Sequence, residues 1–148
     1  MQISNSEDQT VVLSLTDTEG TGLNVSSTQS VVFGHGVTAE FRIMEPVDGT
    51  VPGPITITVE ACDKFCNLVT NEDRDVTLVA SGSATGAGLV DIQGGLGTIE
   101  ISNTVAETVI LTLVDTEGTG LTVESIRDVV FAAPEGLLRV IEELGAKR

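Results

Sequence analysis

Apolar and polar residues alternate with a period of two along most of the chain, which is the pattern of β-strands buried on one face. In the segment 54–62, for example, Ile55, Ile57 and Val59 are separated by threonines. Glycine, proline, asparagine and aspartate interrupt the alternation at short intervals, as turns between antiparallel strands require. The pattern predicts seven strands, over residues 37–45, 54–62, 75–81, 87–93, 96–102, 107–115 and 122–131.

The pattern of the last two strands also occurs near the start of the chain. The sequence Asp-Thr-Glu-Gly-Thr-Gly-Leu at 17–23 returns unchanged at 115–121, and matched positions on either side of it keep the same spacing of 98 residues. This interval is typical of a small β domain. The chain therefore holds about one and a half copies of one unit, in which residues 8–17 and 24–33 repeat the final strand pair.

Three parts follow from this repeat. Residues 1–35 are a partial repeat with a linker, 36–132 a complete antiparallel β-sandwich, and 133–148 a C-terminal amphipathic helix. Pro134 suits the start of a helix, and its apolar residues fall at helical spacing. Because so short a helix is unstable alone, we expect it to pack on its own sandwich, on the extra strand pair or on another subunit. The apolar helix positions are Leu137, Val140, Ile141 and Leu144.

Composition narrows the classes of partner. The formal net charge is −15, from 22 acidic and 7 basic residues. Such a negative field repels phosphate backbones and anionic lipid headgroups, so we expect no nucleic-acid partner and no membrane-surface partner. No apolar run approaches the ~20 residues that span a bilayer, so we expect no membrane insertion.

Several segments together resemble the bacterial Ig-like repeats of the invasin and intimin type. The strand 55–61, the turn 63–70, the glycine-rich hairpin 94–101 and the strand 108–113 carry the likeness, which covers roughly residues 37–132. The resemblance implies an immunoglobulin-like sandwich within a large bacterial surface protein, hence an extracellular or cell-surface location. It implies a spacer or adhesive role without catalysis.

The chain departs from that family in one turn. Where the family usually reads Asp-x-x-Gly-Asn, this chain has Cys66, at a position where we expect a left-handed backbone conformation. Cys62 lies four residues earlier, so the two cysteines are a disulfide candidate. Two free thiols are the alternative. A zinc site would need two further soft ligands, and the only histidine is His35.

Acidic pairs flank the repeated glycines. Asp17 with Glu19, and Asp115 with Glu117, are candidate calcium ligands, although calcium needs six to eight oxygens and each pair supplies only a few. Solvated acidic loops are the alternative reading. No other cofactor is expected.

Catalytic patterns are missing from the sequence. His35 lies between two glycines in the linker, which favours a hinge residue over a catalytic one, and no nucleophile motif or phosphate loop accompanies it. We therefore expect no catalytic residues and no enzyme activity.

Two functions remain. The first is a structural or adhesive surface module whose partners are adjacent Ig-like repeats, with a host or cell-surface receptor as a further candidate partner. The second is a self-assembling filament or surface-layer subunit, in which copies of the chain exchange the duplicated strand pair.

Overall fold

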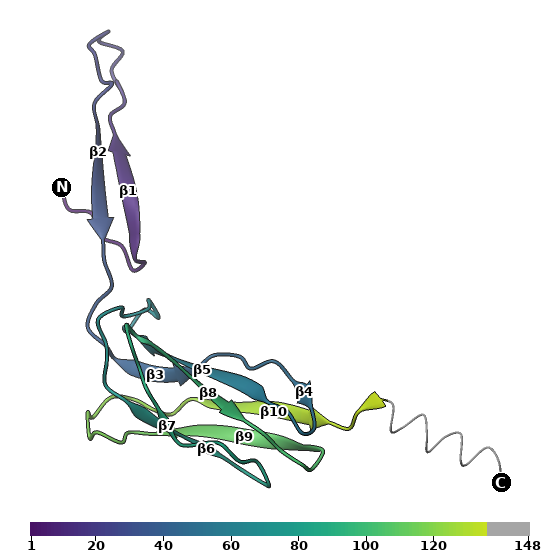
Figure 1. The fold of residues 1–148 in the computed structure, drawn as a ribbon. Helices are drawn as coiled ribbons and strands as arrows, with labels where there is room; N and C mark the ends of the chain where they lie inside the picture. Colours follow the sequence, from purple (N-terminus) through teal and green to yellow (C-terminus); the bar gives the residue numbers. More distant parts are fainter. Residues whose placement is uncertain (136–148) are drawn as a thin grey trace, which may run out of the picture.

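The computed structural model describes residues 1–135, and its regular elements are β-strands. They form a sandwich and a separate strand pair (Figure 1). The predicted all-β fold is therefore confirmed. The predicted C-terminal helix, apart from residues 133–135, lies outside the described residues.

The sandwich has two layers. One sheet has five strands in the order β4-β10-β9-β6-β7, and the facing sheet has three in the order β3-β5-β8 (Figure 1). The strands are β3 (Glu40–Ile43), β4 (Gly49–Thr50), β5 (Ile55–Cys62), β6 (Val76–Ala80), β7 (Leu89–Val90), β8 (Leu96–Ile101), β9 (Glu107–Val114) and β10 (Ile126–Ala132).

All seven strands predicted for the sandwich are present, each shorter than predicted, and β10 ends one residue beyond its predicted bound. The additional strand, β4, is two residues long and pairs in parallel with β10, where Phe131 lies opposite Gly49. A contact of two residues is too short to produce an alternating pattern, so periodicity does not reveal it.

The core lies between the two sheets, where the inward positions of each strand meet. In β5, Ile55, Ile57 and Val59 are buried, and β9 and β10 contribute Leu111 and Phe131 from the opposite sheet. Burying such a side chain stabilises the fold by roughly 1.5–3 kcal/mol. The period of two in the sequence thus corresponds to the two faces of each sheet.

The N-terminal strands stand apart from this core. β1 (Gln9–Ser14) and β2 (Thr28–Phe33) form a two-stranded antiparallel sheet of their own. This hairpin projects from the end of the sandwich where β3 begins (Figure 1). We call residues 1–33 the arm.

Candidate functional site: the arm and its joint with the sandwich

The arm reproduces the β9–β10 hairpin in detail. In the arm, Val11 lies opposite Val31. In the sandwich, Val109 lies opposite Val129, and these are the residues 98 positions after Val11 and Val31. All six residue pairs of the arm have their counterpart in this second ladder. The duplicated sequence therefore folds into the same strand pair in two different surroundings.

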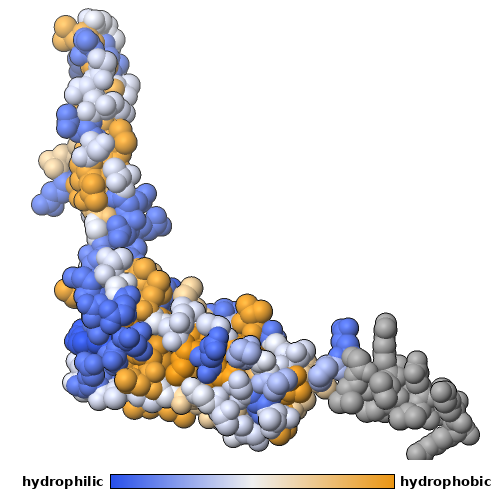
Figure 2. All heavy atoms as spheres, in the orientation of Figure 1, coloured by the Kyte–Doolittle hydropathy of each residue, from blue (hydrophilic) through white to orange (hydrophobic). Residues whose placement is uncertain are grey.

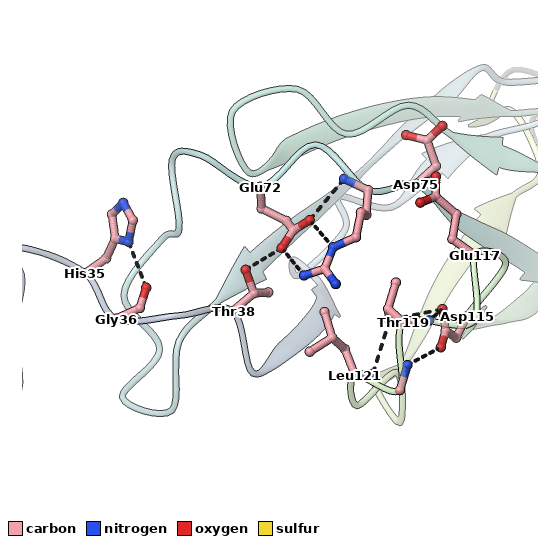
Figure 3. Close-up of polar contacts among 11 residues, drawn as sticks. His35, Gly36, Thr38, Glu72, Asp75, Asp115, Glu117, Thr119 and Leu121 are labelled. Atoms are coloured by element: carbon pink, nitrogen blue, oxygen red, sulfur yellow. Dashed lines mark hydrogen bonds and ion pairs between the residues drawn. The ribbon is translucent and has the colours of Figure 1, made fainter.

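The repeated turn is held by the same backbone hydrogen bonds in both places. The carboxylate of Asp17 accepts hydrogen bonds from the amides of Thr21 and Gly22, at 3.0 and 2.9 Å. Asp115 accepts bonds of the same lengths from Thr119 and Gly120, as Figure 3 illustrates. In each turn these amide donors lower the pKa of the aspartate below its usual range.

These contacts give the calcium candidates a different role. Both aspartates hold their own turns, and Glu117 accepts a hydrogen bond from the Asp75 amide at 3.1 Å. Glu19 is exposed. Within residues 1–135, no three histidine, cysteine or acidic side chains come together in a way that could hold a metal ion.

Burial separates the two hairpins. Val109, Leu111, Val129 and Phe131 are fully buried in the sandwich core. Their counterparts in the arm are only half-buried, and Leu15 is 63% exposed. Hydrophobic residues accordingly show on the surface of the arm (Figure 2). The arm thus leaves open an apolar sheet face, and the equivalent face of the β9–β10 hairpin is buried in the sandwich. The half-buried counterparts are Val11, Leu13, Val31 and Phe33.

A second feature is the joint, by which we mean the linker 34–39, the turn 63–70 and the backbone of residues 6–8. Asn67 bridges the two parts. Its side-chain amide donates to the Ser6 carbonyl at 2.8 Å, and its oxygen accepts from the Asp8 amide at 3.1 Å. One side chain thus binds both a donor and an acceptor of the arm backbone.

Asp63 holds this turn and the linker together. Its buried carboxylate accepts hydrogen bonds from the Asn67 side chain at 2.9 Å, from the Gly36 amide at 2.8 Å and from the amides of Phe65 and Asn67. The Asn67 side chain, followed by the Gly36 amide, holds the pKa of Asp63 well below its usual range. The carboxylate therefore stays charged and keeps its partners over the ordinary pH range.

His35 lies in the linker, as predicted. Its Nδ1 donates to the Gly36 carbonyl at 2.9 Å, and its Nε2 lies 3.1 Å from Thr70 Oγ1 in the turn (Figure 3 shows the first contact). These contacts tie the linker to the sandwich, which is a positional role. A cleft of about 480 Å³ opens beside the joint between the arm and the sandwich, and its lining includes Glu7, Val37 and Phe65.

The disulfide candidate is not formed in the structure. Both thiols are free: Cys62, the last residue of β5, is buried, and Cys66 is exposed on the turn. Burial raises the pKa of Cys62 to about 12, so its thiol stays protonated. Cys66 has a φ of 65°, which confirms the predicted left-handed conformation.

Sequence reasoning missed the role of Asp63 and Asn67. Both lie within the turn 63–70 that carries the family resemblance, and their four-residue spacing in that turn was the available signal. The partners of Asn67 in the arm, Ser6 and Asp8, are however about sixty residues away and contribute backbone atoms, which leave no trace in a sequence pattern. Among the described residues, no helix is long and apolar enough to cross a membrane.

No protein-family model matches this sequence, and no curated protein matches it. Solved structures do match. A glycosyl hydrolase family 2 member from Bacteroides cellulosilyticus aligns with a TM-score of 0.56 and 14% identity, over 84% of this chain and 17% of that chain. A beta-glucuronidase from glycoside hydrolase family 2 aligns with a TM-score of 0.54 and 17% identity, over 75% and 13%.

A beta-glycosidase from Bacteroides vulgatus gives a TM-score of 0.52 and 12% identity, over 74% of this chain and 16% of that chain. Each match thus spans a small part of the glycosidase chain. At these identities the likeness shows a shared β-sandwich fold. It carries no activity over to this chain, since one sandwich fold serves many functions.

Proposed function

We propose that the chain is a non-enzymatic structural module of a bacterial surface protein, in which Ig-like units follow one another in a tandem array. The joint carries the proposal. The partial unit and the complete unit are connected by a short linker. On the side of the complete unit, Asn67 binds the backbone of the arm and Asp63 binds the Gly36 amide of the linker. Such contacts favour a fixed orientation between successive units, which a spacer requires.

The acidic residues support a structural role over a catalytic one. Asp17, Asp63 and Asp115 each accept two or more hydrogen bonds from backbone amides of nearby turns. A carboxylate held in this way is a strong acceptor with a lowered pKa, which is unsuited to general acid catalysis near neutral pH. These side chains stabilise loops at the ends of the sandwich and of the arm.

The experiment compares the joint in the wild-type chain and in Asn67→Ala. Residual dipolar couplings of the amides at 6–9 and 34–37 should fit the same alignment tensor as the sandwich in the wild type. Loss of the Asn67 bridge should shrink these couplings toward zero while those of the sandwich persist.

Asn24→Ala is the matched control, because Asn24 caps a turn within the arm through the Ser26 amide and touches no part of the joint. It should leave the couplings at the joint unchanged. Couplings near zero around the joint of the wild-type chain would mean that the units reorient freely, and the proposal of a fixed spacer would then be wrong.

A further inference from the structure

The arm leaves three surfaces without the partners that its duplicate has. In the sandwich, β9 pairs with β6 as well as β10, β10 pairs with β4 as well as β9, and the apolar face of both is covered by the core. Within residues 1–135, β1 and β2 pair only with each other. An isolated two-stranded hairpin is marginally stable in water, so we infer that the arm has a partner.

The duplicate also defines what that partner must look like. Leu13 and Leu15 of the arm correspond to Leu111 and Leu113, which lie opposite Ala80 and Leu78 of β6. At the other edge, Phe33 corresponds to Phe131, which pairs with β4. The partner therefore offers the counterparts of β3 to β8 and lacks a closing hairpin of its own.

A second copy of this chain does not meet that requirement. Its own β9–β10 hairpin already occupies the sandwich with Val109, Leu111 and Phe131 fully buried. An arm that displaced this hairpin would bury its own apolar face and expose an equal one. Exchange between copies therefore yields no net burial of apolar surface. In an open sandwich, by which we mean one that lacks its closing hairpin, docking of the arm would bury the whole apolar face.

The residues before β1 indicate where the open sandwich lies. Ile3-Ser4-Asn5 repeats Ile101-Ser102-Asn103, and Ile101 is the last residue of β8. The turn is repeated as well, because Asn5 accepts the Glu7 amide at 3.1 Å and Asn103 accepts the Val105 amide at 2.9 Å. The likeness thus continues beyond the hairpin into the preceding strand, which an exchange hairpin alone would not need.

We propose that the arm is the closing hairpin of an Ig-like unit that precedes it in the polypeptide, and that the strands of this unit cover Val11, Leu13, Leu15, Val31 and Phe33. The inference rests on the proposed tandem array but concerns a different surface from the joint. A free joint would leave this docking intact, and an uncovered arm would leave the joint intact, so the two experiments fail separately.

The test supplies the missing strands. A copy of residues 36–98 is placed directly before Met1 of the full chain, which preserves the spacing of the repeat. Hydrogen exchange then compares the amides of β1 and β2 with and without this extension. We expect the extension to slow their exchange on the order of a thousandfold or more, as for a hairpin inside a cooperative domain. The sandwich 36–132 serves as the standard in the same sample.

Two variants of the extended chain test the face. Leu13→Asp should abolish the protection, because its counterpart Leu111 is fully buried, whereas Val12→Asp should preserve it, because Val12 is 64% exposed on the opposite face. The proposal is overturned if the extension leaves the arm unprotected, or if Val12→Asp abolishes protection as Leu13→Asp does. It is also overturned if the unextended chain already protects its arm in an oligomer, because the occupant would then be a second copy.

Discussion

The arm and the β9–β10 hairpin are the same structure in two environments. Their strand registers agree at every pair of the arm. Their turns use equivalent aspartates, Asp17 and Asp115, whose backbone hydrogen bonds have the same lengths. Yet Phe131 is buried and Phe33 is only half-buried. The comparison shows that strand pairing and turn geometry arise locally in this sequence, whereas burial depends on which sheet lies opposite.

The largest expected effect comes from truncating the aromatic residue that the two hairpins share. Phe131→Ala should destabilise the sandwich by about 3–5 kcal/mol, because it removes a large buried side chain and leaves a cavity. Phe33→Ala should change the free energy of unfolding of the sandwich by less than about 0.5 kcal/mol. Urea denaturation followed by circular dichroism measures both. Equal losses would show that the arm contributes to the core of the sandwich.

A second difference between the two regions is the carboxylate of Glu72, which lies in the sandwich and has no counterpart in the arm. Glu72 is buried, accepts a hydrogen bond from Thr38 at 2.5 Å and binds the Arg74 guanidinium at 2.6 and 2.7 Å (Figure 3). These contacts, with Arg74 as the main cause, lower the pKa of Glu72 to about 2. Its stabilising contribution is therefore complete above the unfolded pKa of about 4.3 and is lost as the pH falls through about 2.

Glu72→Gln should accordingly cost on the order of 1–3 kcal/mol at neutral pH. It should also flatten the decline of sandwich stability between about pH 4 and 2. Melting temperatures across this range provide the measurement. The arm, which has no counterpart of this residue, should respond equally to acid in both proteins. An unchanged pH profile in the variant would assign the acid sensitivity to other carboxylates.

A smaller effect is expected from the glycine that ends the repeated turn. Gly120 and Gly22 have φ values of 73° and 72°, and a Cβ added to either would meet no atom within 4 Å. The cost of alanine is then only that of the left-handed conformation, about 1 kcal/mol. Gly120→Ala should lower sandwich stability by that amount, and Gly22→Ala should not. A much larger loss of stability in Gly120→Ala would mean that the turn in the sandwich makes contacts that the equivalent turn in the arm lacks.

The smallest effect concerns the aspartate of that turn. The pKa of Asp115 is lowered by the amides of Thr119 and Gly120, so its contribution is present above the unfolded pKa and disappears as the pH falls through the folded value. Asp115→Asn should slightly reduce sandwich stability at pH 7 and have less effect in acid. Asp17→Asn should leave the sandwich unchanged at both pH values. Proton titrations by NMR should give lowered pKa values for both aspartates if the turns are equivalent.

Much of the sandwich could be predicted from the chain because its strands alternate clearly and its turns carry glycine, proline and aspartate. The left-handed residue at Cys66 was predictable for the same reason, since one position of a tight turn requires it. The disulfide candidate illustrates the limit. A spacing of four residues permits a bridge, but both thiols are free, with Cys62 buried at the end of β5 and Cys66 exposed on the turn.

The joint could not be predicted, because its contacts join positions with no sequence relationship. Asn67 binds the backbone at Ser6 and Asp8, and backbone atoms are common to all residues. Hydrophilic residues do gather where the arm meets the sandwich (Figure 2). Their arrangement, however, follows from how the linker leaves β2 and enters β3, which the periodicity of the strands leaves open.

By itself, the sequence of the duplicated segment determined its strand register and its aspartate turn, because the interactions that create them lie within a few residues or across one hairpin. Only the tertiary structure decided that Val109, Leu111 and Phe131 are core residues while Val11, Leu13 and Phe33 form an open face. The physical reason is that burial needs a second sheet. The strands β3, β5 and β8 supply that sheet to one copy, and the other copy projects away from them (Figure 1).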